Sequence, residues 1–282
     1  MKKLKLLAVA ASAMALAFAL AGCGSQSAST GSASAQASGS ASSADATQLV
    51  VGFDSAYPPY GFVADDGSYT GFDLDLAKEV ADRNGWEFKA EPIDWDAKDA
   101  LLNSGNINCI WNGFTMEGRE NDYTFSEPYM LNEQVVVVKA DSGIASLADL
   151  AGKTVMTQVD SAALDVLEGD QADLAATFNG GAAQTIGDYN NAFMQLDSGQ
   201  VNAVACDLSI AQYQIAKTGD KYIQLSEPLS DEHYAVGFKK GDTELAEQVS
   251  KTLKEMYEDG TVQKLCEKYA DYGLSFDNWI LK

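Results

Sequence analysis

Strand-like and helix-like segments alternate along most of this chain, and that alternation limits its possible folds more than any other feature. Short apolar runs at 48–53, 86–90 and 107–111 are separated by helical patterns over 71–84 and 94–102. Strands connected by helices pair side by side in a parallel sheet, with helices covering both faces. We therefore predict an α/β fold.

The same alternation starts a second time and gives another α/β unit. The second set of expected strands is 134–138, 153–158, 183–186 and 201–206, with helices at 161–178, 189–197 and 207–216. A strand at 233–238 and helices at 244–258 and 261–269 close the chain. With the strands near 137 and 235 as crossings, we expect a first lobe of 48–138 and 235–282 and a second lobe of 139–234. Open α/β sheets bind ligands at the carboxyl ends of their strands, so the cleft between the lobes is the expected site.

The first 23 residues have the pattern of a secretion signal. Lys2, Lys3 and Lys5 precede an apolar run from Leu6 to Leu20, which is too short and too rich in small residues for a membrane span. Leu20-Ala21-Gly22-Cys23 resembles a bacterial lipobox, in which the cysteine is lipidated and becomes the mature N-terminus. We therefore expect a lipid anchor on Cys23 at the outer face of the cell membrane.

Residues 24–47 are almost wholly Ser, Ala, Gly, Thr and Gln, a composition that cannot bury a core. This segment is expected to be a flexible tether with a typical reach of roughly 27 Å. A globular part held close to a membrane surface would need such a tether.

Charge and cysteine content exclude several classes of function. The formal net charge of −22 repels nucleic acid and anionic lipid headgroups. After Cys23, the cysteines are Cys109, Cys206 and Cys266, so at least one is unpaired, and the first two lie in apolar runs that predict burial. No metal-ligand spacing is present, and the single histidine, His233, has no nucleophile motif beside it. We expect neither a metal nor a cofactor, and no catalytic triad.

The loop that follows the strand at 107–111 carries the strongest candidate for ligand binding. Thr115 and Arg119 lie four residues apart in it, and Arg119 is one of two arginines in the chain. A guanidinium binds a carboxylate through two parallel hydrogen bonds, and a nearby hydroxyl can complete the shell of the anion. The alternative is that Arg119 is a solvated surface charge beside Glu117 and Glu120.

A series of short motifs, in order along nearly the whole chain, resembles one known family. They are Val50-Gly52-Phe53-Asp54 with Tyr57-Pro58-Pro59-Tyr60, Gly71-Phe72-Asp73-Leu74, Trp95-Asp96, Gly113-Phe114-Thr115 with Arg119, Phe125-Ser126-Glu127-Pro128-Tyr129, Asp160-Ser161-Ala162, Asp188-Tyr189, Asp207, Gly237-Phe238, and Asp259-Gly260-Thr261. Together they resemble the family 3 extracellular solute-binding proteins of amino-acid ABC transporters. That resemblance implies a type II periplasmic-binding fold, with two lobes joined by a two-strand hinge.

The resemblance also implies a role for individual residues. Arg119 and Thr115 would bind the ligand carboxylate from the first lobe, Asp207 would bind the ammonium group from the second, and Ser161 and Ala162 would offer hydroxyl and backbone N–H groups to the same carboxylate. The remaining expected pocket residues are Asp54, Tyr57, Tyr60, Trp95, Trp111, Asn112 and Gly113. Asp160 stands where glycine is common in the family.

A structural role is the alternative for several of these residues. Trp95, Trp111, Tyr57 and Tyr60 could be core residues, and Asp54 could cap a turn. The acidic pairs Asp65-Asp66 and Asp231-Glu232 are expected to be solvated loop charges, and His233 to be structural or exposed.

The predicted function is capture of a polar amino acid by a monomeric, lipid-anchored protein that delivers it to an ABC permease, without covalent chemistry. Asp54 and the aromatic residues favour a cationic or an uncharged polar side chain, and the choice among arginine, lysine, histidine, glutamine and cystine stays open. One rival is a cyclohexadienyl dehydratase-like enzyme on the same scaffold, with Glu117 or Asp160 as the general acid. Another is an extracellular amino-acid sensor or adhesion module.

Overall fold

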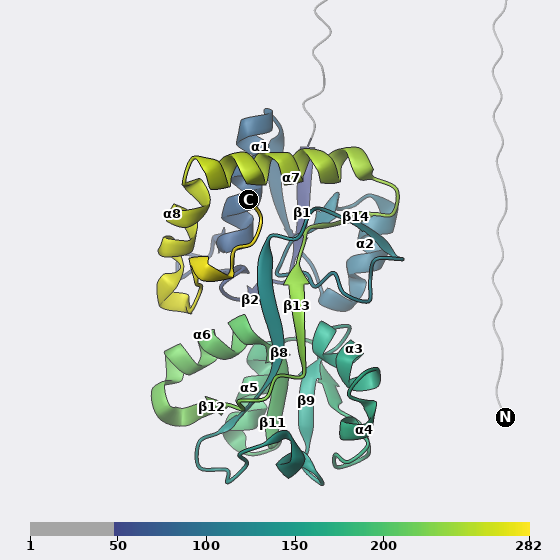
Figure 1. Cartoon of the computed structure of the whole chain (residues 1–282), viewed down its shortest axis with the longest axis vertical. Helices are drawn as coiled ribbons and strands as arrows, with labels where there is room; N and C mark the ends of the chain where they lie inside the picture. Colours follow the sequence, from purple (N-terminus) through teal and green to yellow (C-terminus); the bar gives the residue numbers. More distant parts are fainter. Residues whose placement is uncertain (1–47) are drawn as a thin grey trace, which may run out of the picture. The chain divides into compact units, whose positions relative to one another are not determined.

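The first sheet joins strands from the beginning of the globular part with one from near its end. The computed structural model describes residues 48–282, and in it β1 (Gln48–Phe53) pairs in parallel with β5 (Glu87–Pro92) and β6 (Cys109–Ile110). β14 (Gly237–Lys239) pairs antiparallel with β6 and with β7 (Tyr123–Phe125), which gives the order β5-β1-β6-β14-β7. The helices that accompany this sheet are α1 (Phe72–Asn84), α2 (Lys98–Ser104), α7 (Thr243–Glu258) and α8 (Thr261–Lys268). Figure 1 shows α7 lying across the end of this sheet, next to α1 and α8.

The second sheet is built around one long strand. β8 (Met130–Lys139) pairs antiparallel with β11 (Ala203–Asp207), β12 (Tyr222–Gln224) and β13 (Ser230–Tyr234). Beyond β11, β9 (Val155–Gln158) and β10 (Gln184–Ile186) complete the sheet in parallel. Its helices are α3 (Ala162–Glu168), α4 (Ala172–Ala175), α5 (Tyr189–Ser198) and α6 (Leu208–Thr218). We call the first sheet and its helices the first lobe, and the second sheet and its helices the second lobe.

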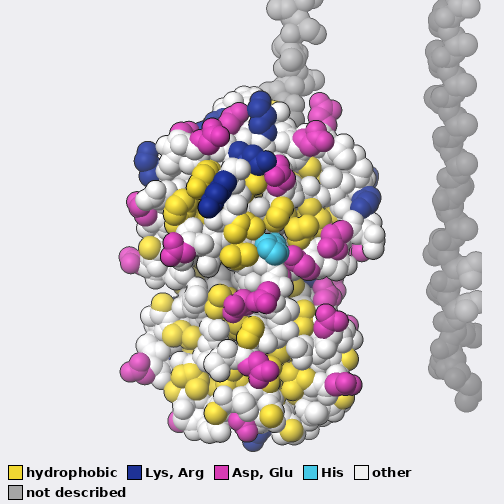
Figure 2. Space-filling view, in the orientation of Figure 1, with side chains coloured by type: hydrophobic (Ala, Val, Ile, Leu, Met, Phe, Trp, Pro, Cys, Tyr) yellow, Lys and Arg dark blue, Asp and Glu magenta, His cyan; other side chains and the backbone are white. Residues whose placement is uncertain are grey.

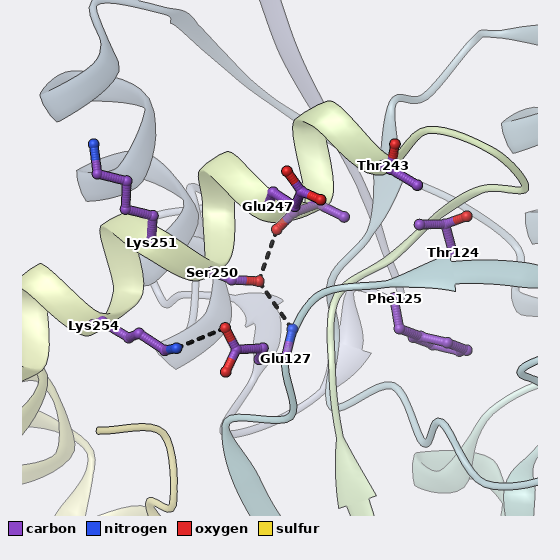
Figure 3. Close-up of a pocket in the computed structure, with 9 residues that line it drawn as sticks. Thr124, Phe125, Glu127, Thr243, Glu247, Ser250, Lys251 and Lys254 are labelled. Atoms are coloured by element: carbon purple, nitrogen blue, oxygen red, sulfur yellow. Dashed lines mark hydrogen bonds and ion pairs between the residues drawn. The ribbon is translucent and has the colours of Figure 1, made fainter.

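The chain crosses between the two sheets twice, after β7 and after β13. The start of the first crossing is held by α7, because Ser250 Oγ accepts a hydrogen bond of 2.9 Å from the backbone N–H of Glu127. Lys254 pairs with the Glu127 carboxylate at 2.6 Å, and these residues line a groove on the first lobe (Figure 3). Near the C-terminus, Trp279 forms an antiparallel bridge with Met130 of β8. The last residues of the chain therefore contact the second sheet as well as the first lobe.

Both sheets are mixed, whereas the alternation of elements predicted parallel sheets. After each crossing the chain enters the other sheet from the end opposite to that of its parallel strands. As a result, β8 and β14 pair antiparallel with their neighbours. Because β8 pairs along its length with second-lobe strands, sheet pairing places residues 130–138 in the second lobe, although we expected them in the first. Residues 1–47, with the expected signal, lipobox and tether, lie outside the described residues.

Several local predictions also differ from the structure. The expected helix 161–178 is two helices, since the chain turns at Gly169, and the expected strand 233–238 is the separate strands β13 and β14. The loop with two prolines leads into a small sheet that we did not predict, formed by β2 (Ala56–Tyr57), β3 (Gly61–Val63) and β4 (Tyr69–Thr70). As expected, Cys109 and Cys206 are buried. Cys266 is buried too, and the structure shows all three cysteines unpaired, which the sequence had left open.

Candidate functional site

A narrow cavity lies between the two lobes. Nine of the expected site residues line it: Tyr57, Trp95, Asn112, Gly113, Thr115, Arg119, Ser161, Ala162 and Asp207. Gln158, the last residue of β9, also lines it and was missed. Its position at the carboxyl end of a strand, three residues before a helix cap, is the signal that could have identified it.

Three of the expected residues do not line this cavity. Asp54 lies behind it and accepts a hydrogen bond of 2.7 Å from Gln158 Nε2. Tyr60 is 2% exposed and packs edge-to-face on Tyr234, with ring centres 5.2 Å apart. Trp111 is fully buried against Tyr129. The two aromatic residues therefore pack in the core, which is the alternative that the sequence left open.

The Arg119 guanidinium lies at the junction of the lobes. Its Nη2 is 2.7 Å from Asp165 Oδ2 on α3 of the second lobe, and its guanidinium carbon lies 5.0 Å from the centre of the Phe114 ring. The side chain is 11% exposed. Arg119 is thus a largely buried cation at the cavity, and its ion pair with a half-exposed carboxylate crosses between the lobes.

Asp207 presents a buried carboxylate to the cavity from the end of β11. One of its oxygens, Oδ1, accepts hydrogen bonds from Asn132 Nδ2 at 2.9 Å, Gln134 Nε2 at 2.8 Å and the Tyr234 hydroxyl at 2.8 Å. Within residues 48–282, the structure records no hydrogen bond to the other oxygen, Oδ2. The Tyr57 hydroxyl also lies beside this carboxylate. A carboxylate fixed in this way at the cavity is suited to bind a cationic group.

Glu232 is a buried acid beside this site, and our expectation that it would be a solvated loop charge was wrong. The residue is 2% exposed because β13 pairs with β8 and turns this side chain inward. Its Oε1 accepts hydrogen bonds from Thr115 Oγ1 at 2.7 Å, Asn132 Nδ2 at 2.5 Å and Gln134 Nε2 at 2.7 Å. Burial and the neighbouring charge of Asp207 raise the pKa of Glu232 to about 7. Asp231, the other member of that pair, is exposed as expected.

The loop carrying Gly113 and Thr115 is held by both lobes. The Gly113 N–H donates to Asp73 Oδ2 at 2.6 Å, and Gly113 has φ +59, a conformation that favours glycine. Thr115 forms an antiparallel bridge with Tyr234 of β13. Asp73, at the start of α1, is fully buried, and this burial raises its pKa to about 7. The backbone of this loop is therefore fixed where it meets the cavity.

The opposite wall of the cavity is the beginning of α3. Ser161 is the N-cap of α3, and its Oγ accepts a hydrogen bond of 3.1 Å from the Leu164 N–H. The preceding residue, Asp160, has φ +54 and is the one non-glycine residue with positive φ within 48–282. This conformation explains why a glycine would suit the position.

Asp160 is held in place by side chains of the first lobe. Its backbone oxygen accepts hydrogen bonds from Trp95 Nε1 at 3.1 Å and Arg119 Nη2 at 3.4 Å. Its carboxylate lies 3.3 Å from Lys98 Nζ, and Lys98 is only 4% exposed. These contacts connect Asp160 of the second lobe to three side chains of the first lobe.

The described residues contain no group of three or more His, Cys, Asp or Glu side chains arranged to hold a metal ion. Within 48–282 no helix is both long enough and apolar enough to cross a membrane. His233, the cyan side chain near the junction of the lobes in Figure 2, is half-exposed and its Nδ1 lies 2.7 Å from Glu117 Oε1.

Comparison with known proteins assigns the chain to a family. Residues 49–272 match the model of the bacterial extracellular solute-binding proteins, family 3. The chain belongs to this family. Among curated family relatives, it is 31% identical over 224 residues to the L-cystine-binding protein TcyJ of Escherichia coli strain K12, covering 78% of this chain and 82% of that protein. It is 29% identical over 225 residues to the arginine-binding extracellular protein ArtP of Bacillus subtilis strain 168, covering 79% and 86%.

Solved structures agree with this assignment. The substrate-binding protein of an ABC uptake transporter from Streptococcus pneumoniae, solved with bound histidine, has a TM-score of 0.76 and 35% sequence identity. That match covers 79% of this chain and 92% of the streptococcal chain. The fold is therefore the type II periplasmic-binding fold that the resemblance implied.

Proposed function

We propose that this protein is the substrate-binding component of an ABC importer and captures a polar amino acid between its lobes. The observation that supports this most directly is the cavity lined by Arg119 from the first lobe and Asp207 from the second. The relatives are named for binding cystine and arginine, and a solved neighbour holds histidine. The ligand is thus an amino acid whose carboxylate binds Arg119 and whose ammonium group binds Asp207.

The charges of such a ligand explain why both residues are needed. A zwitterion buried in a cavity loses the solvation of both its charges, and each must be paired. Because Arg119 and Asp207 belong to different lobes, a ligand that contacts both stabilises the closed state over the open one. Gln158, Asn112, Tyr57 and Trp95 then surround the side chain of the ligand. The acidic residues Asp207 and Glu232 are buried nearby. Because they would repel a negative charge, the cavity favours a cationic or neutral side chain over an acidic one.

The dehydratase-like alternative required a general acid at the bound carboxylate. Glu117 is exposed and pairs with His233, and Asp160 pairs with Lys98. Neither side chain lines the cavity. A binding protein without covalent chemistry is therefore the better-supported function.

The cellular arrangement follows from the signal and tether in the sequence. We propose that a lipid on Cys23 holds the protein at the outer face of the cell membrane, that residues 24–47 give the lobes reach, and that a monomer delivers the amino acid to the permease subunits.

A thermal-shift screen of the twenty common amino acids with cystine, ornithine and citrulline tests the proposal. A ligand at about 100 times its dissociation constant adds about 2.7 kcal/mol to the free energy of unfolding, which raises the melting temperature measurably. We expect one chemical class to stabilise the protein. Prephenate turnover with no stabilisation by any amino acid would contradict the proposal.

A further inference from the structure

Thr115, Glu232 and Asp207 are connected by one set of hydrogen bonds beside the cavity. Asn132 Nδ2 and Gln134 Nε2 each donate to both carboxylates, at 2.9 and 2.8 Å to Asp207 and at 2.5 and 2.7 Å to Glu232. The Thr115 hydroxyl completes the set at 2.7 Å from Glu232 Oε1. All five side chains are buried. Thr115 and Asp207 line the cavity, whereas Glu232 lies behind Thr115 and does not.

Counting donors and acceptors fixes the direction of the Thr115 hydrogen bond. Glu232 Oε1 already accepts from two amide nitrogens, so it acts as an acceptor, and the Thr115 hydroxyl must supply its single proton to it. The lone pairs of Thr115 are then what this hydroxyl can offer to the cavity. An ammonium group only donates hydrogen bonds and a carboxylate only accepts them.

We infer that Glu232 is a positioning residue of the ammonium site, which fixes Thr115 as a hydrogen-bond acceptor that binds the ligand ammonium group together with Asp207. This inference rests on the proposed function, and it changes the role that the family resemblance implied for Thr115, which was to help Arg119 bind the carboxylate. Glu232 also brings a second negative charge close to the ammonium group. The cavity thereby separates an acidic side, with Asp207, Thr115 and Glu232, from the guanidinium of Arg119.

The arrangement predicts that ligand binding is linked to release of a proton. Before binding, two buried carboxylates share the same donors, and burial with the charge of Asp207 raises the pKa of Glu232 to about 7. An ammonium group bound beside them offsets this repulsion and lowers the pKa of Glu232. Near pH 7 the free protein holds a fraction of a proton on Glu232 that the complex loses. Affinity therefore rises from pH 6 to pH 8.

Proton release by Glu232 must be distinguished from proton release by other groups near it. The titratable and charged side chains around it are Glu117, Arg119, Glu133, Asp165, Asp170, Asp207, Asp231, His233 and Tyr234. His233 is the imidazole closest to Glu232 in the sequence, and its side chain contacts the half-exposed Glu117. His233→Gln is therefore the matched control for Glu232→Gln, which keeps the shape and an acceptor oxygen but has no proton to release.

Isothermal titration calorimetry of the purified protein tests the proton link, with L-arginine and L-histidine as probes. Binding at pH 7 is measured in phosphate and in Tris, whose ionisation enthalpies differ, so the difference in heat gives the number of protons exchanged. We expect the wild type and His233→Gln to release about half a proton, as follows from a pKa near the working pH. Glu232→Gln should release none. Equal release by Glu232→Gln and the wild type would overturn the proton link.

The role of Thr115 is tested with ligand analogues that lack one charged end. For the probe that binds, the ammonium-free analogue is 5-guanidinopentanoate or imidazolepropionate, and the carboxylate-free analogue is agmatine or histamine. Thr115→Val should weaken the intact amino acid and the carboxylate-free analogue by about tenfold or more, because a hydrogen bond to a charged group is lost. It should not weaken the ammonium-free analogue, and Thr115→Ser should restore binding.

The opposite pattern, a loss confined to the ammonium-free analogue and the intact amino acid, would place Thr115 at the carboxylate and overturn this inference while leaving the proposed function standing. No binding of any amino acid of the thermal-shift screen to the wild type would contradict both, since the inference rests on the proposed function.

Discussion

Arg119 and Asp165 form an ion pair across the two lobes, with Nη2 and Oδ2 2.7 Å apart. The two side chains differ in exposure, 11% for Arg119 and 58% for Asp165. The remaining guanidinium donors make only long contacts to backbone oxygens, at 3.5 Å to Thr115 and 3.4 Å to Asp160. Asp165 therefore orients Arg119 from the solvent side, and the other donors stay available to a ligand carboxylate.

This difference in exposure predicts unequal effects of removing the two partners. Arg119→Ala should weaken amino-acid binding by about 30-fold or more, because truncating one partner of a buried charge pair costs about 2 to 5 kcal/mol. Asp165→Asn should weaken it by at most about fivefold, since exposed ion pairs contribute about 0.2 to 1 kcal/mol. Dissociation constants from calorimetry check both values. Comparable losses in the two variants would show that the cross-lobe pair, rather than a ligand contact, accounts for the effect of Arg119.

The contact between Lys98 and Asp160 predicts an effect on the rate of ligand release. Asp160→Asn keeps a side chain that tolerates positive φ but leaves the buried Lys98 ammonium without its carboxylate in the closed state. We expect the dissociation rate constant in stopped-flow fluorescence to rise about two- to fivefold. The exposed Asp173→Asn, on α4 of the same lobe, is the control and should not change it.

A double-mutant cycle decides whether this effect comes from the pair itself. Lys98→Met should add little to Asp160→Asn, because the interaction is already lost. Fully additive effects of the two substitutions would mean that the residues act independently on lobe closure.

Asp73 predicts a specific pH dependence of stability. Its pKa is about 7 in the folded protein, because of burial, against an ordinary value of 3.8. Between these values the folded state binds more protons than the unfolded state, so the contribution of Asp73 is complete below about pH 4 and is lost as the pH rises to about 7. Urea unfolding at several pH values should show a smaller decline over this range for Asp73→Asn than for the wild type.

The exposed Asp141→Asn provides the control for this measurement and should decline as the wild type does. If Asp73→Asn and Asp141→Asn had the same pH dependence, the neutral form of Asp73 would not be part of the folded state.

The sequence predicted those parts of the fold and site that depend on local patterns. The loop with Thr115 and Arg119 and the cap at Ser161 follow recognisable strand ends, and all three residues line the cavity. The sequence could not decide the roles of Trp111 and Tyr60, because an aromatic residue next to a site loop can either line the site or pack in the core behind it.

The burial of Glu232 could not be predicted from the local sequence pattern. In the sequence, Asp231-Glu232 has the composition of an exposed turn. Its burial depends on pairing with β8, about 100 residues earlier, where Asn132 and Gln134 supply the donors that make a buried carboxylate possible. The mixed pairing of β8 and β14 was missed for the same reason, since antiparallel partners far apart in the chain leave no local signal.

Recognition of both ends of one amino acid by different lobes is tested most directly by combining variants with altered ligands. Calorimetry would use the amino acid that stabilises the protein most, its carboxamide and its N-acetyl form, against the wild type, Arg119→Ala and Asp207→Asn. The carboxamide should bind the wild type weakly but lose nothing further in Arg119→Ala, and the N-acetyl form should behave in the same way towards Asp207→Asn. If each variant weakened the binding of both altered ligands as much as it weakens binding of the unaltered amino acid, Arg119 and Asp207 would not contact the two ends of the ligand.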